Sequence, residues 1–227
     1  AYGYSHDGGF AEFVAVKAAA THKLPEHVSL EEGALGEPLA VGVHAALEVG
    51  RVRAGQLCLV TGAGPIGIMC ALVAQAVGAR AVLAGLAVDR ERLEAARRAG
   101  LTNLVASDRE DLAKALGGQA DVALECSGAP PAVADCLSLL RPQGRLVQVG
   151  LFNQIPPVDL NGVALKELSL LGSFAHHPAS WNLALELLEE KKINLAPLVS
   201  GIYGLEQWEE PFRLSERGLG VKHLLRA

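Results

Sequence analysis

Short apolar runs alternate with longer amphipathic stretches from about residue 57 to about residue 173. The apolar runs have the length and the β-branched character of buried strands. Six strands are predicted, at residues 57–61, 81–84, 103–106, 121–125, 145–149 and 168–171. Because the connections between them are too long for hairpins, the alternation predicts an α/β fold with a doubly wound, six-stranded parallel sheet covered by helices on both faces.

Helices are predicted between these strands, at residues 66–77, 89–99, 108–116 and 130–140. Gly100 follows the second helix at the position that glycine favours after a helix end. Asp108 is a candidate N-cap for the third, and the Pro130-Pro131 pair is tolerated in the first turn of the fourth. Residues 142–144 are predicted to form a turn.

The two ends of the chain do not follow this alternation. Residues 10–17 have a strand-like pattern, and residues 22–28 are rich in turn formers. Near the C-terminus, residues 198–203 and 221–225 are strand-like and flank a polar helical piece. The two ends are therefore predicted to meet as part of a second, β-rich domain.

The first predicted strand runs directly into G-x-G-x-x-G, formed by Gly62, Gly64 and Gly67, and a helix-length apolar segment follows. A strand, a tight turn and a helix are the context of the Rossmann dinucleotide fingerprint. Gly62 allows the turn, Gly64 allows backbone amides to approach a diphosphate, and Gly67 allows close packing of helix and strand. Pro65 and Ile66 belong to the same predicted site, at the positive end of the helix. An ordinary glycine turn is the alternative.

Composition narrows the function classes. The 227 residues are 50% hydrophobic and carry a net charge of −5 with interspersed signs, so neither a nucleic-acid partner nor a membrane surface is expected. No apolar run approaches the roughly 20 residues of a membrane span, and the N-terminus does not resemble a signal peptide, so a cytoplasmic location is expected. The four cysteines form no C-x-x-C pair and are predicted to be buried thiols.

Six motifs occur in order: D-G-G-F-A-E-F at 7–13, G-E-P-L-A at 36–40, T-G-A-G-P-I-G at 61–67, E-C-S-G at 125–128, G-R-L-V-Q-V-G at 144–150 and L-G-S-F at 171–174. Together they resemble the medium-chain, zinc-type alcohol dehydrogenase superfamily, most closely its polyol (sorbitol) and threonine dehydrogenase branch. The resemblance implies that residues 1–38 are the tail of a GroES-like catalytic domain, 39–185 an NAD(P)-binding Rossmann domain, and 186–227 a return to the catalytic domain. The family's Cys and Gly-His-Glu zinc ligands do not occur in this sequence.

The same resemblance assigns cofactor contacts. The residues that end or follow the fourth and fifth strands would line the ribose and the nicotinamide; they are Ser127, Gly128, Val149, Gly150 and Leu151. Ser173 and Phe174, after the sixth strand, would contact the nicotinamide carboxamide or the dimer partner. Lys222 would reach the diphosphate. The alternatives are ordinary turn chemistry for the strand-end residues and a solvated surface position for Lys222.

The coenzyme type stays open. The acidic residue that binds the ribose of NAD is expected about 20 positions past the glycines, where this chain has Gly85 or Leu86. Asp89 is one candidate for that role, although capping of the following helix is the plainer one. Alternatively, Gly85 leaves room for a 2′-phosphate with Arg90 or Arg92 as its partner, so both NAD and NADP remain candidates.

Glu37 is the metal candidate. The resemblance implies that it approaches the catalytic zinc of the full-length enzyme, directly or through water; a surface or interdomain carboxylate is the alternative. His176 and His177 are adjacent and point to different sides, so joint metal binding is not expected, and surface or capping roles are predicted for the histidines.

The function that the resemblance implies is hydride transfer between a nicotinamide cofactor and a secondary alcohol or polyol. This chain alone is not expected to turn over an alcohol, and no catalytic residue is assigned to it. Two alternatives remain: a zinc-free quinone or enone reductase of the same superfamily, which the Gly36-Glu37-Pro38 segment disfavours, and a non-catalytic dinucleotide-binding module. A homodimer or homotetramer is expected, paired through the edge strand near residues 168–173.

Overall fold

The computed structural model describes residues 2–3 and 5–227; residues 1 and 4 of the predicted 1–38 segment lie outside the description. A six-stranded parallel sheet forms its centre, in the order β3-β2-β1-β4-β5-β6. The strands are β1 (Leu57–Thr61), β2 (Arg80–Gly85), β3 (Leu104–Ala106), β4 (Ala120–Glu125), β5 (Leu140–Gln148) and β6 (Ser169–Gly172). The prediction of a doubly wound, six-stranded parallel sheet is confirmed. The strand order reverses between β1 and β4, and ligands of open α/β sheets bind beyond the carboxyl ends of the strands at such a point.

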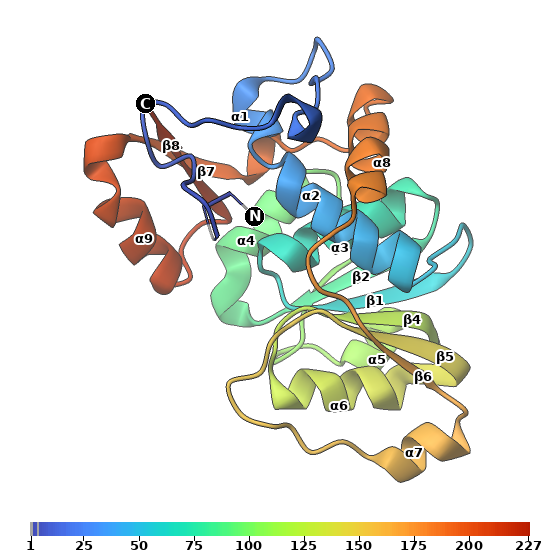
Figure 1. The fold of residues 1–227 in the computed structure, drawn as a ribbon. Coiled ribbons are helices and arrows are strands. Elements are labelled where there is room, and N and C mark those ends of the chain that lie inside the picture. Colours follow the sequence, from blue (N-terminus) through green and yellow to red (C-terminus); the bar gives the residue numbers. More distant parts are fainter. Residues whose placement is uncertain (1, 4) are drawn as a thin grey trace.

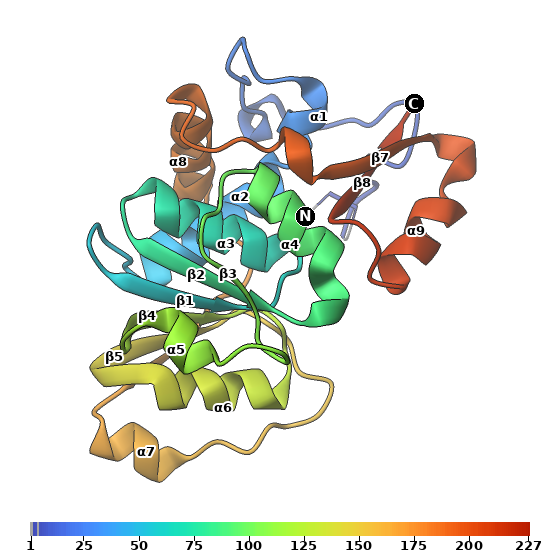
Figure 2. The ribbon, with the colours of Figure 1, turned by 180° about the vertical axis from the view of Figure 1, so that it is seen from behind.

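Helices cover both faces of this sheet (Figures 1 and 2). One face carries α2 (Gly36–Val43), α3 (Pro65–Ala76), α4 (Arg90–Arg98) and α8 (Pro178–Glu189), and the other carries α5 (Leu112–Leu116), α6 (Pro130–Leu139) and α7 (Leu160–Leu165). Two short helices, α1 (Leu30–Gly33) and α9 (Glu209–Glu216), lie outside these layers. None of the helices within the described residues combines the length and the hydropathy that a membrane crossing requires.

The strands divide their side chains between two cores. Cys58 and Val60 belong to the cluster that packs under α2 and α3, whereas Leu59, between them, belongs to the cluster under α5 and α6. This alternation follows from the two-residue period of a strand. Because both faces are covered, β1 is almost entirely apolar, and that continuous apolar pattern is what made the strand visible in the sequence.

The buried helix α2 was missed by the sequence analysis. Gly42 lets α2 lie against α3, because a Cβ at Gly42 would come within 2.9 Å of the Met69 carbonyl carbon. Beyond α2 the chain continues as a π-helical segment, His44–Val49. The apolar run after Gly36 and the proline in the first turn were the available signals.

Three local predictions were wrong. Residues 10–17 form no strand in the described part of the chain, and Phe13 is 92% exposed; a strand needs a neighbour for its hydrogen-bond ladder. The third predicted helix begins at Leu112, with Asp111 as its N-cap, while Asp108 accepts a hydrogen bond from Ala87 N. Residues 142–144 lie within β5, where the pairing with β4 shifts register, rather than in a separate turn.

The two ends of the chain lie side by side (Figure 1). Near the C-terminus, β7 (Val199–Gly204) and β8 (Lys222–Arg226) form a separate two-stranded parallel sheet. The rings of Phe10 and Phe212 meet edge to face at 5.9 Å, and Arg226 forms an ion pair with Glu31. The predicted domain boundaries at residues 38 and 185 remain predictions.

The edge of the main sheet is β6, with Leu170 41% and Leu171 37% exposed. An uncovered apolar edge tends to find a partner strand. Pairing of two copies at this edge therefore stays a prediction.

Asp121 joins the beginnings of three strands, and we expect its replacement by asparagine to weaken the fold. Its carboxylate accepts hydrogen bonds from Leu57 N (2.8 Å) and Arg141 Nε (2.7 Å). Burial raises the pKa of Asp121, but these two hydrogen bonds and the Arg141 charge outweigh burial and hold the pKa below its ordinary value. Asp121→Asn is expected to lower the free energy of unfolding at pH 7 by about 1 kcal/mol, a figure discounted for partial exposure.

The sign of the pH dependence follows from the lowered pKa. Since the folded pKa lies below the unfolded value of about 3.9, the stabilisation is present above that pH and is lost as the pH falls through the folded pKa. Urea unfolding at pH 7 and at pH values below about 3.9 measures this difference, which should shrink as the pH is lowered. Burial raises the pKa of Asp135, so Asp135→Asn is the control and should cause no loss at pH 7. An Asp121→Asn effect of equal size at neutral and at low pH would contradict the assignment.

Candidate functional site

The loop between β1 and α3 contains three glycines with different structural requirements. Gly62 has φ of +96°, and its amide donates to Ala84 O at 2.8 Å, which ties the loop to β2. A Cβ at Gly67 would collide with Gly62 O, so only glycine lets α3 begin this close to the strand. At Gly64, by contrast, no heavy atom of the described residues lies within 4 Å of a Cβ position. The space in front of Gly64 is open.

The N-terminus of α3 faces this open space with unpaired donors. The first amides of a helix have no partner within the helix, and Pro65, the first residue, has no N–H. Among the described residues no side chain caps this end, and the first turn contains no acidic residue. The positive end of the helix dipole is therefore free to bind an anion, with Ile66 and Gly67 as amide donors.

The loops after β4 and β5 close against the glycine loop. A Cβ at Gly62 would lie 2.8 Å from Ser127 N, and one at Gly128 would collide with Leu151 O. Gly150 packs against Gly128 N in the same way. The fold thus brings the predicted residues Ser127, Gly128, Gly150 and Leu151 together beside the glycine loop, and Val149 N donates to Glu125 O at 2.8 Å.

Glu125, at the end of β4, holds these loops together and was not singled out from the sequence. Its side chain is fully buried. It accepts hydrogen bonds from Ser127 N (2.8 Å), Gly128 N (3.1 Å) and Gln148 Nε2 (2.5 Å), and also from the hydroxyls of Ser127 and Thr61. Every one of these partners is a donor, so the carboxylate acts only as an acceptor. An acidic residue directly after the apolar run 122–124 was the available signal.

Asp89 lies beside the glycine loop and closes the turn after β2. Its Oδ2 accepts from Leu86 N at 2.9 Å, and a Cβ at Gly85 would lie 2.7 Å from the Ala63 Cβ and 3.4 Å from Asp89 Oδ2. Arg92 donates from Nε to Gly220 O at 2.8 Å, and one of its terminal nitrogens lies 3.8 Å from Asp89 Oδ1. Asp89 and Arg92 are therefore both engaged within the protein.

The remaining predicted cofactor residues, Ser173, Phe174 and Lys222, have different surroundings. Ser173 N donates to Gln148 O at 2.9 Å, and the buried Ser173 Oγ has no hydrogen-bond partner in the described part of the chain. Phe174 is 81% exposed. Lys222 begins β8, outside the six-stranded sheet, although its neighbour Gly220 contacts Arg92.

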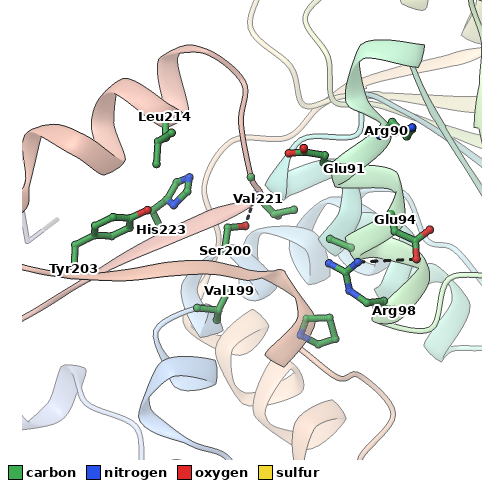
Figure 3. A pocket seen from close by; sticks show the side chains of 13 residues that line it. Arg90, Glu91, Glu94, Arg98, Val199, Ser200, Tyr203, Leu214, Val221 and His223 are labelled. Atoms are coloured by element: carbon green, nitrogen blue, oxygen red, sulfur yellow. Dashed lines mark hydrogen bonds and ion pairs between the residues drawn. The ribbon is translucent and has the colours of Figure 1, made fainter.

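A pocket of about 660 Å³ opens between α4 and the β7–β8 sheet (Figure 3). Arg90, Glu91 and Arg98 from α4 face Tyr203 and His223 from the two strands across it. None of the glycines of the β1–α3 loop lines this pocket, so it is separate from the glycine loop.

The thiols are not poised for nucleophilic chemistry. Cys58, Cys70 and Cys136 are buried, as predicted, and Cys126 is half-buried. Burial raises the pKa of the Cys58 thiol well above its ordinary range and that of Cys136 to about 12. Since the thiolate is the nucleophile, the raised pKa values disfavour nucleophilic chemistry by Cys58 and Cys136 at neutral pH.

Glu37 lies beside one imidazole, that of His176. It stands in the first turn of α2, its side chain is 57% exposed, and its Oε1 lies 3.5 Å from His176 Nε2. A zinc site needs three or four ligands, so this pair does not fit zinc by itself. Within residues 2–3 and 5–227, the group of three ligand atoms that converges is His44, Glu48 and His177, which does not include Glu37.

That second polar cluster links the helical segment after α2 to α8. Glu48 accepts from Ser180 Oγ at 2.9 Å and lies 2.5 Å from His44 Nδ1. Burial raises the pKa of Glu48, but the hydrogen bonds to His44 and Ser180 and the nearby imidazoles outweigh it and hold the pKa below its ordinary value. His177 N donates to Ser180 Oγ at 3.1 Å, so His177 is the residue that precedes α8 and helps to cap it.

Comparison with known proteins identifies the family. Residues 65–190 match the family model described as zinc-binding dehydrogenase. The sequence is 37% identical to sorbitol dehydrogenase of Halalkalibacterium halodurans, over 98% of this chain and 66% of that protein. It is 36% identical to sorbitol dehydrogenase of Homo sapiens, over 97% of this chain and 63% of that protein.

The fold agrees with a solved structure of the same kind. The crystal structure of L-idonate 5-dehydrogenase from Escherichia coli matches 98% of this chain and 65% of that chain, with a TM-score of 0.85 and 31% identity. The chain spans about two thirds of the length of the curated relatives it matches. By these matches, and by the fingerprint loop at its strand-order reversal, the chain belongs to the medium-chain zinc-type dehydrogenases.

Proposed function

We propose that this chain binds a nicotinamide dinucleotide with its diphosphate at the N-terminus of α3. It would be the cofactor-binding part of a zinc-dependent alcohol or polyol dehydrogenase. The observation that carries the proposal is the contrast between the packed Gly67 and the open Gly64 at a helix end without a capping side chain. That arrangement exposes amide donors to a ligand phosphate while excluding any side chain from their approach.

The nearby loops supply the remaining contacts in this proposal. Ser127 and Gly128 border the ribose, and Gly150 and Leu151 border the nicotinamide. Ser173 Oγ, buried without a partner among the described residues, is available to the carboxamide. Glu125 holds the Ser127–Gly128 loop in place and does not itself reach the ligand in this proposal.

The chemistry of the full enzyme follows from its cofactor. When bound, the nicotinamide exchanges a hydride with the carbon of a secondary alcohol or polyol. The residues of this chain bind and orient the ring and exclude water from one of its faces. Because Glu37 and His176 provide fewer donors than zinc requires, we expect this chain to bind dinucleotide without turning over an alcohol.

Equilibrium titration with NADH and NADPH tests the proposal. We expect saturable binding of one dinucleotide per chain, followed by nicotinamide fluorescence or calorimetry, and no turnover of sorbitol with NAD⁺ or NADP⁺. Absence of saturable binding of either nucleotide to the folded chain would contradict it.

We expect NADH to bind at least about tenfold more tightly than NADPH. A 2′-phosphate would approach the Asp89 carboxylate, while Arg92 is already engaged by Gly220 O. Although an Arg92 nitrogen lies 3.8 Å from Asp89 Oδ1, the carboxylate still presents a like charge to a 2′-phosphate and disfavours the phosphorylated ligand. Asp89→Asn removes the charge but keeps an oxygen that can accept from Leu86 N. We therefore expect it to reduce the difference between the NADH and NADPH affinities.

Glu91→Gln, an exposed acidic position on the same helix, is the control and should leave the NADH to NADPH ratio unchanged. Tighter binding of NADPH by the unmodified chain would show that the arginines, rather than Asp89, decide the coenzyme. That result would contradict the expected coenzyme preference but not the proposal that the chain binds a dinucleotide.

A further inference from the structure

His44, Glu48 and His177 bring three metal-ligand groups together from two separate segments. One ligand atom from each side chain lies within 4.8 Å of those of the other two. The imidazole rings of His44 and His177 meet edge to face, with their centroids 4.6 Å apart. Zinc–nitrogen and zinc–oxygen bonds of about 2.0–2.1 Å place tetrahedral ligand atoms about 3.3 Å apart, so small side-chain shifts would bring the three to coordination distance.

The surroundings of the cluster suit a cation. Two imidazoles and one carboxylate form a donor set of the kind that binds Zn²⁺. The His44 side chain is 10% exposed and that of Glu48 is 30% exposed, while His177 lies at the surface, so an ion can enter from solvent. Ser180, fully buried, donates to Glu48 Oε1 and leaves Oε2 for the cluster. Such outer-shell hydrogen bonds orient metal ligands in known sites.

We propose that His44, Glu48 and His177 bind one divalent transition-metal ion, Zn²⁺ in the first instance, with solvent in the remaining coordination position. The ion would fasten the start of α8 to the helical segment that follows α2. The site shares no residue with the Glu37–His176 pair, and its existence does not depend on dinucleotide binding.

Zinc titration of the metal-free chain tests the proposal. Calorimetry should give one Zn²⁺ per chain, Co²⁺ should develop the visible absorption of a low-coordinate site, and Zn²⁺ should raise the melting temperature. Glu48→Gln and His177→Ala each remove one ligand. Ser180→Ala removes only a hydrogen bond to a ligand and is expected to weaken zinc binding by about 10–100-fold. Each of the two ligand variants should weaken zinc binding by more than that. Glu48→Gln preserves size and an oxygen for Ser180, so it separates loss of the site from loss of folding.

Three matched variants complete the test. His6→Ala removes another exposed histidine, and Glu37→Gln and His176→Ala disable the other carboxylate–imidazole pair; all three should bind Zn²⁺ as the unmodified chain does. The proposal is overturned if the chain binds no zinc, or if Glu48→Gln and His177→Ala bind it unchanged. A loss of binding in Glu37→Gln or His176→Ala instead would place the ion at that other pair and equally overturn the proposal.

Discussion

Replacing Gly64 with alanine is expected to weaken dinucleotide binding by about 100-fold or more, equivalent to about 2.7 kcal/mol, without unfolding the chain. A Cβ at Gly64 meets no heavy atom of the described residues within 4 Å, and the backbone conformation (φ −78°, ψ 175°) suits alanine. The added methyl would instead occupy the path by which a diphosphate reaches the amides of α3. The same substitution at Gly67 should act on the fold, because its Cβ would collide with Gly62 O.

Backbone atoms cannot move aside as a flexible side chain can, so Gly67→Ala is expected to cost about 3 kcal/mol, the upper part of the range for overpacking. Urea unfolding and NADH titration of both variants measure the two effects separately. Gly9→Ala is the matched control, since a Cβ there also meets no heavy atom of the described residues within 4 Å and the position is exposed. Unchanged NADH affinity in Gly64→Ala would show that the diphosphate lies elsewhere.

Removing the buried Glu125 carboxylate is expected to cost about 3 kcal/mol of stability in Glu125→Ala, since several partly buried donors would lose their acceptor at up to about 1–3 kcal/mol each. The amides of Ser127 and Gly128 would lose their side-chain acceptor, and the side chain of Gln148 would keep only Gly150 O. Because these groups lie beside the glycine loop, nucleotide affinity should fall with stability. The variant tests whether a buried acceptor, rather than local turn chemistry, shapes the β4 and β5 loops.

Glu125→Gln should be milder, because one amide oxygen can still accept from Ser127 N and Gly128 N. Its NH₂ group would face Gln148 Nε2, which must then rotate and give up its hydrogen bond to Gly150 O. Urea unfolding measures the stability of the two Glu125 variants, and NADH titration measures their nucleotide affinity. Glu186→Ala, on the exposed surface of α8, is the control. Equal stability of Glu125→Ala and the unmodified chain would rule out the anchoring role.

The sheet was predictable because its signals are local. Apolar, β-branched runs such as Leu57–Thr61 are buried on both faces, and the glycine fingerprint marks one strand end and the next helix start. The strand-like pattern of residues 10–17 misled for a related reason. Apolar character reports burial or pairing with some partner, and in the described residues that segment has no neighbouring strand.

The candidate site also has features that the sequence predicts and features that depend on contacts between distant segments. The sequence alone determined the parallel sheet, the succession of its six strands along the chain, and the glycine loop, because periodicity and steric demands act between near neighbours. Only the tertiary structure decided that Glu125 would accept hydrogen bonds from residues in or after β1, β4 and β5, and that His44 and Glu48 would meet His177. Those contacts depend on how the strands register and how α8 packs on α2, and pairings between distant segments leave no periodic trace in a single sequence.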